Sequence, residues 1–200
     1  MKKSMRPFNA KNSDSNAPNK SLRSQPFALA YIDIDNFKSF NDRYGYGRGN
    51  EVLIVTCRIL TMVVGELAGP EGFVGHVGGD DCVFMSRPDS IDAIYQTVIK
   101  RFDLVIPDFY DRDDRLKGYI DSVDRRGNTE QFPIMSLSIA VVTNERVPIA
   151  HPGDVSKIAS ELKQRAKAAK GSVYVKDERG QAIDAFSAAA DSTAQLPAPD

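Results

Sequence analysis

The segment GGDD at residues 78–81 is the feature that most restricts how this 200-residue chain can fold. It stands between two short, largely apolar runs, residues 73–77 and 82–86. Tight hairpin turns need positive φ angles, which glycine adopts without steric strain. The segment therefore predicts a β-hairpin with two carboxylates at its tip.

Strands and helices are expected to alternate around this hairpin, because short apolar runs indicate strands and apolar residues at helical spacing indicate helices. The expected elements are a strand at 27–33, helices at 37–44 and 49–66, the hairpin, a helix capped by Ser90, a strand at 133–142, a helix capped by Asp154 and a strand at 172–176. Residues 111–131 are polar, and we expect a long excursion there that ends in a turn at 126–128. The core order is βαββαβ, the ferredoxin-like α+β arrangement, with an antiparallel sheet and helices on one face. The other face, or the ends of the central strands, would then hold a ligand.

Composition and charge are typical of one folded domain. Apolar residues make up 42% and charged residues 26% of the chain, and residues 1–25 and 177–200 have no hydrophobic period, so we expect two tails around a folded unit at 26–176. The net charge of −1 provides no basic field for DNA or anionic membranes. No segment is apolar enough to span a bilayer, and no apolar signal segment follows the N-terminus. Cys57 and Cys82 indicate neither a disulfide scaffold nor a zinc cluster. We expect a soluble cytoplasmic protein.

Acidic residues gather where the first strand and the hairpin should meet. Asp33 ends the first strand, and Asp80 and Asp81 lie at the hairpin tip. Converging carboxylates raise one another's pKa unless a cation lies between them. Oxygen ligands at strand ends favour Mg²⁺, which shares its coordination shell with substrate phosphates. The alternative is an ordinary polar hairpin tip, since Gly and Asp are common in turns.

Two blocks, DIDNFKSFNDRYGYGRGNEVL from Asp33 and GHVGGDDCVFM from Gly75, resemble the GGDEF domain of diguanylate cyclases. The first block of that family has the pattern D-x-D-x-F-K-x-x-N-D-x-x-G-H-x-x-G-D, and the second is G-G-D/E-E-F. The resemblance covers about residues 27–175 and implies the nucleotide-cyclase fold. The polar insert before Pro133 and the GGDDC form of the motif indicate a divergent branch.

The resemblance implies that two GTP molecules, one held by each monomer of a homodimer, are joined into cyclic di-GMP with release of pyrophosphate. A ribose 3′-hydroxyl attacks an α-phosphorus, and two Mg²⁺ (or Mn²⁺) ions neutralise charge and align the groups. By similarity, Asp33, the Ile34 carbonyl and Asp80 would hold metal, and Asp80 would be the candidate base. Asp81 is also a candidate metal ligand, although it replaces the usual Glu and is one methylene shorter.

The resemblance also implies residues that bind the substrate. Lys38 and Lys167 match the family's lysines that balance triphosphate charge, Lys38 as a catalytic group, and Phe37 matches a wall of the nucleotide pocket. A solvated helix face is the alternative for Lys167, and core packing is the alternative for Phe37. Gly171 stands where the family has an Arg, so one bidentate phosphate contact is lost.

Base recognition departs furthest from the family pattern. Asn41 matches a guanine-contacting Asn, but Asn50 replaces an Asp and Tyr46 replaces a His. A carboxylate accepts two hydrogen bonds from guanine, whereas an amide has one acceptor and also donates, which adenine can match. Cys82 replaces the last Phe of the motif and would leave the hairpin base less filled.

Three hypotheses follow. The first is a cyclase that makes cyclic di-GMP. The second is a degenerate domain that binds a nucleotide or a protein without catalysis, and it is favoured by the departures at Asn50, Asp81, Cys82 and Gly171. The third is a cyclase with relaxed base choice that also uses ATP and makes cyclic GMP-AMP. The family's RxxD product-inhibition site falls at Gly69 and Gly72 and is therefore absent, and a separate regulatory protein is expected as a partner.

Overall fold

A computed structural model describes residues 26–123, 129–145, 149 and 151–179. The segments 1–25 and 180–200, expected to be tails, and the turn expected at 126–128 lie outside these ranges. The strands are β1 (Ala28–Ile34), β2 (Phe73–Gly78), β3 (Asp81–Ser86), β4 (Tyr119–Val123), β5 (Thr129–Pro133), β6 (Leu137–Thr143) and β7 (Val173–Lys176). The helices are α1 (Phe37–Tyr44), α2 (Tyr46–Leu67), α3 (Pro88–Val105), α4 (Arg112–Lys117) and α5 (Pro152–Lys167), with short 3₁₀ helices η1 (Gly69–Glu71) and η2 (Ile106–Phe109). Within the described part of the chain, no helix combines the length and the apolar character needed to cross a membrane.

Five strands form the main sheet in the order β2-β3-β1-β6-β7. β1 lies between β3 and β6 and is antiparallel to both, and β2 and β3 form the predicted hairpin. These four strands, with α2 and α3 as the connecting helices, are the predicted ferredoxin-like core. β7 adds a fifth strand parallel to β6, so the sheet is mixed and not wholly antiparallel as expected.

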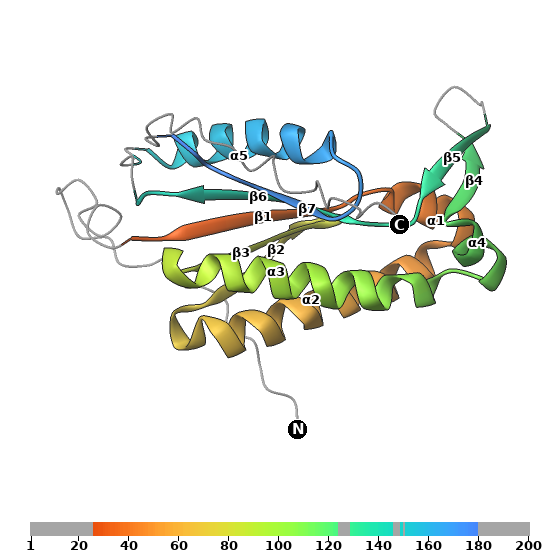
Figure 1. The fold of residues 1–200 in the computed structure, drawn as a ribbon, viewed down its shortest axis with the longest axis horizontal. Helices are drawn as coiled ribbons and strands as arrows, with labels where there is room; N and C mark the ends of the chain where they lie inside the picture. Colours follow the sequence, from red (N-terminus) through yellow and green to blue (C-terminus); the bar gives the residue numbers. More distant parts are fainter. Residues whose placement is uncertain (1–25, 124–128, 146–148, 150, 180–200) are drawn as a thin grey trace, which may run out of the picture.

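Helices cover both faces of this sheet (Figure 1), with α2 and α3 on one side and α5 on the other. The expectation that all helices share one face is therefore wrong for the last helix. Ile158, Ala159 and Leu162 of α5 pack against Ala140 and Val142 of β6. All seven residues of β6 are buried, as expected for a strand covered from both sides. A ligand site is consequently left at the strand ends and not on an open face.

The larger core lies between the sheet and the pair α2 and α3. Its members come from β1, β3 and β6, from α1 and from the inner faces of α2 and α3. Burial of each large apolar side chain contributes about 1.5–3 kcal/mol. The largest fully buried side chains of this core include Ile32, Phe40, Leu60, Phe84, Ile94 and Phe102.

Two helices begin differently from the prediction. α3 starts at Pro88, where a missing N–H is no loss, and the Ser90 hydroxyl, expected to cap it, donates to the carbonyl of Arg87. α5 is capped by His151, whose side chain accepts from a backbone N–H, while Asp154 accepts from the backbone N–H of His151. The predicted cap residue Asp154 is therefore the third residue of the helix and the partner of His151 in a capping box.

The polar segment 111–131 is more ordered than predicted. It contains α4 and most of a separate two-stranded sheet, β4 and β5, which lies beside α1 and α4 at one end of the molecule (Figure 1). Pro133 ends β5 and does not open the next strand, which starts at Leu137.

Candidate active site

The end of β1 and the turn between β2 and β3 lie at the same end of the sheet. Ile32 of β1 pairs with Cys82 of β3, so the next residue along β1, Asp33, lies beside the hairpin tip. Gly79 in this turn has φ 59°, a left-handed conformation that favours glycine. The structure thus brings Asp33 together with Asp80 and Asp81, as the sequence predicts.

Two lysines from α5 reach these carboxylates. The Nζ atom of Lys163 lies 2.7 Å from Asp33 and 2.5 Å from Asp81, and the Nζ atom of Lys167 lies 2.7 Å from Asp33. Residues four apart share one face of a helix, so both lysines point the same way. Lys167 therefore does not belong to a free solvated face. Lys163 was missed by the sequence analysis, although its spacing from Lys167 is a signal that could have found it.

The carboxylates differ in their protonation behaviour. Asp33 is only 5% exposed, and burial alone would raise its pKa, but hydrogen bonds from Lys163 and Lys167 lower the pKa below the ordinary value. Burial raises the pKa of Asp80, and the negative charges of Asp33 and Asp81 raise it further. Among the described residues, Asp80 is the one of these three carboxylates that forms no ion pair.

Asp35, two residues beyond Asp33, has neutral partners. Its carboxylate accepts hydrogen bonds of 2.9 Å from the hydroxyls of Ser136 and Ser138. Burial raises the pKa of Asp35, and these hydroxyls oppose the rise only in part. The end of the sheet therefore carries more carboxylates than the two lysines neutralise.

The carboxylates and the Ile34 carbonyl at this end of the sheet are possible ligands of a metal ion. Among the described residues, no three His, Cys, Asp or Glu side chains lie close enough to hold a metal on their own. Asp33, Asp80 and the Ile34 carbonyl nevertheless supply hard oxygen donors at adjoining positions, which fit a Mg²⁺ ion that takes the rest of its shell from water and phosphate.

A second group of predicted residues lies where α1 meets α2. The Oδ1 atom of Asn41 is buried and has no hydrogen-bond partner within the described part of the chain. A Cβ atom at Gly49 would lie 1.8 Å from this oxygen, so any larger residue there would displace the Asn41 side chain. Phe37 is 9% exposed and packs in the main core, as its alternative role predicted. Buried polar atoms are normally paired, so Asn41 is suited to accept a hydrogen bond from a ligand.

The other predicted substrate residues are exposed. Lys38 forms an ion pair with Asp42 one turn away, and Tyr46 and Asn50 lie in the first turns of α2 with Tyr46 75% exposed. Gly171 has φ 76°, so the Arg of the family pattern would be strained there.

Comparisons with known proteins indicate the family of the chain. Residues 9–107 match the family model described as diguanylate cyclase, GGDEF domain. The chain is 33% identical over 71 residues to a diguanylate cyclase of Vibrio cholerae serotype O1, an alignment that covers 36% of this chain and 21% of that protein. The chain therefore spans about a fifth of the length of this curated relative.

Solved structures show the same fold. The GGDEF domain of YfiN (TpbB) from Pseudomonas aeruginosa matches with a TM-score of 0.54 and 20% identity, covering 80% of this chain and 91% of that one. The active GGEEF domain of a diguanylate cyclase from Vibrio cholerae matches with a TM-score of 0.52 and 20% identity, covering 78% and 86%.

Proposed function

Because the chain belongs to the GGDEF domain family of diguanylate cyclases, we propose that it is a Mg²⁺-dependent nucleotidyl cyclase that condenses two GTP molecules into cyclic di-GMP and releases pyrophosphate. The observation that carries the proposal is the meeting of Asp33, Asp80 and Asp81 with two lysines at one end of the sheet. Surplus carboxylates together with flexible cations suit a site that binds metal and triphosphate together.

Each group has a distinct task in this proposal. Asp33, the Ile34 carbonyl and Asp80 would hold divalent metal, which when bound neutralises phosphate charge and activates the α-phosphorus. Lys163 and Lys167 would turn from the carboxylates toward the phosphates. Asp80, which has no cationic partner among the described residues, would accept the proton of the ribose 3′-hydroxyl. Because each copy of the chain would hold one GTP, turnover needs a homodimer, which a separate regulatory protein would promote.

A cyclase assay tests this proposal. Purified protein is incubated with GTP and Mg²⁺ over a range of protein concentrations, and cyclic di-GMP is measured by mass spectrometry. Asp80→Asn should abolish the product, whereas Asp113→Asn, on the exposed side of α4, should not change it. GTP binding without product at any protein concentration would overturn the catalytic proposal in favour of the non-catalytic nucleotide-binding domain.

The α1–α2 corner, where Asn41 and Asn50 lie, favours a second candidate, a cyclase of relaxed base choice that also makes cyclic GMP-AMP. The unpaired Oδ1 of Asn41 would accept from an exocyclic amino group, and the adjoining Asn50 offers an amide where the family has a carboxylate. An amide has one acceptor and two donors, which can match the amino group and the N1 acceptor of adenine. Reactions with GTP, ATP and an equimolar mixture distinguish the two candidates. Asn50→Asp should shift the products toward cyclic di-GMP by about tenfold or more.

A further inference from the structure

The two cysteines of the chain lie side by side in the fold. Cys57 is in the middle of α2 and Cys82 is near the start of β3, separated by 25 residues in sequence. Their Sγ atoms are 4.0 Å apart, within the contact distance of two thiols. A disulfide has an S–S distance of about 2.05 Å, so the two atoms need to approach by about 2 Å.

One of the two thiols can be reached from a groove. Cys57 is partly exposed and lines a groove of about 530 Å³ between α2 and β2, together with Met62, Arg58 and His76. Cys82 lies behind it and is 2% exposed. A small oxidant would therefore meet Cys57 first, with Cys82 already in place behind it.

We propose that Cys57 and Cys82 form a redox-modification site that closes to an intramolecular disulfide when a peroxide enters this groove. The Cys57 sulfur attacks one peroxide oxygen and the O–O bond breaks; the leaving hydroxide takes the thiol proton, so a sulfenic acid and one water result. The Cys82 sulfur then attacks the Cys57 sulfur and the S–O bond breaks; the leaving hydroxide takes the Cys82 thiol proton and departs as a second water. In total the two thiols lose two protons and two electrons, and the peroxide is reduced to two waters.

The position of the pair links this reaction to the carboxylate cluster. Cys82 directly follows Asp81 and pairs across the sheet with Ile32, the residue before Asp33. The disulfide would fasten this part of β3 to α2, the helix whose first turns hold Gly49 and Asn50. Oxidation should therefore restrict the hairpin tip relative to the α1–α2 corner, and a reducing agent should release it.

Oxidation of the full chain tests the modification site without any nucleotide. The reduced protein is treated with hydrogen peroxide, and free thiols, intact mass and cross-linked peptides are measured. Both thiols should be lost together, with a mass decrease of about 2 Da, no covalent dimer and a peptide joining residues 57 and 82. The melting temperature should rise by roughly 5–10 °C and return to its starting value with dithiothreitol.

Single-cysteine variants provide the matched controls. Cys57→Ser and Cys82→Ala should show only oxygen adducts or covalent dimers after peroxide, with no rise in melting temperature. If the unmodified chain also gives only such products, and no peptide joins the two cysteines, the proposal is overturned.

The effect on the carboxylate cluster rests on the proposed function and has its own measurement. GTP binding and turnover of the oxidised chain should differ from those of the reduced chain by several-fold, and dithiothreitol should reverse the change. Equal binding and turnover in the two forms would overturn the link while the thiol data still establish the site. If the reduced chain makes no cyclic product, the proposed function fails and the disulfide measurements are unaffected.

Discussion

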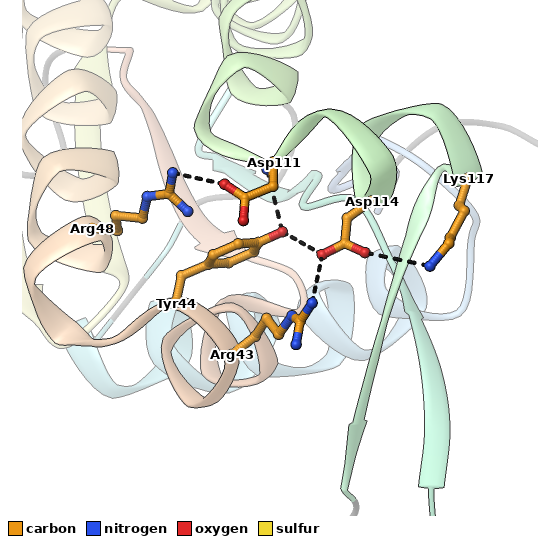
Figure 2. Close-up of polar contacts among 6 residues, drawn as sticks. All are labelled: Arg43, Tyr44, Arg48, Asp111, Asp114 and Lys117. Carbon is orange, nitrogen blue, oxygen red and sulfur yellow. Dashed lines mark hydrogen bonds and ion pairs between the residues drawn. The ribbon is translucent and has the colours of Figure 1, made fainter.

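Two buried aspartates at different places in the molecule both contact cationic side chains, but the net charge around them differs. Asp33 at the end of β1 is 5% exposed and is held by two lysines. Asp114 on α4 is 4% exposed and accepts a hydrogen bond of 2.6 Å from the Tyr44 hydroxyl, with Arg43 and Lys117 also in contact (Figure 2). The hydrogen bond from Tyr44 and the charges of Arg43 and Lys117 lower the pKa of Asp114. In both places the ionised carboxylate is the stable form.

The difference lies in what surrounds each carboxylate. Around Asp114 the charges are close to balanced, since Asp111 pairs with Arg48 at 2.9 Å, and Arg48 also lies over the ring of Tyr44 (Figure 2). This network joins α1 and the start of α2 to the polar insert.

Around Asp33 the balance fails, because Asp35, Asp80 and Asp81 add negative charge and the pKa values of Asp35 and Asp80 are raised. A buried ion pair alone is therefore weak support for a binding site, whereas the uncompensated excess of carboxylates around Asp33 supports the proposed one.

Replacing Asp33 should have the largest effect on activity. Asp33→Asn keeps the shape of the side chain but removes the charge that pairs with both lysines and that would hold metal in the proposed function. Formation of cyclic dinucleotide should fall by about 100-fold or more, because metal coordination is worth several kcal/mol in the transition state. Steady-state product formation measures this change, and circular dichroism should show a folded protein. Activity within fivefold of the original would mean that the carboxylate excess is not the catalytic site.

Asp114→Asn should affect stability and not activity, the opposite of the pattern expected for Asp33→Asn. The variant leaves Arg43 and Lys117 without their buried anion, so the free energy of unfolding should fall by about 2–3 kcal/mol. The matched variant Tyr44→Phe removes the hydrogen bond that the Tyr44 hydroxyl donates to Asp114 and the longer one that it accepts from the backbone N–H of Asp111, and should lose about 1–2 kcal/mol. Urea unfolding measures both values. A loss of GTP affinity at unchanged stability would show instead that this network binds ligand, and the contrast with Asp33 would disappear.

Much of the fold could be predicted because its signals are local. The hairpin could be predicted from Gly78 and Gly79, and the meeting of the carboxylates at the end of the sheet from the order and register of the strands. The side of the sheet that α5 covers does not follow from the periodicity of α5, since one apolar stripe fits either face. The missed signal was in β6, whose sequence LSIAVVT does not alternate and is typical of a strand buried on both faces.

The missed parts depend on tertiary contacts of polar residues. Lys163 reaches Asp33 because of the way α5 crosses the sheet, and composition cannot distinguish such a lysine from Arg165, which is 60% exposed. The insert at 111–131 looked irregular because its helix and hairpin bury few apolar side chains, among them Ile120. Asp114 adds a buried polar contact with Tyr44 of α1.

Lys163→Met tests whether the lysines at the Asp33 site occupy the place of a metal. Methionine keeps the length of the side chain but has no charge to compete for Asp33 and Asp81. Binding of Mn²⁺ or Mg²⁺ without nucleotide should tighten by about fivefold, corresponding to about 1 kcal/mol for a partly exposed ion pair. Isothermal titration calorimetry measures the affinity, and Arg165→Met on the same helix is the control. Weaker metal binding in Lys163→Met would show that the lysine supports the metal site and does not compete with it.

The smallest expected effect is a difference in pH dependence. The folded-state pKa of Asp114 is lowered, so its contribution to stability is fully present above the ordinary value of 3.8 and is lost as the pH falls through the lower folded pKa. The stability deficit of Asp114→Asn should therefore shrink in acid.

Asp35 has a raised pKa, so any stability linked to its proton is present below 3.8 and is lost as the pH rises through the higher folded pKa. Asp35→Asn, which can still accept from Ser136 and Ser138, should stabilise the metal-free protein at about pH 7 by less than about 1 kcal/mol and have no effect near pH 3. Urea unfolding from about pH 3 to about pH 7 compares both variants with the original chain. Stability differences that do not change with pH would mean that folding shifts neither pKa, which would remove the electrostatic basis of the comparison.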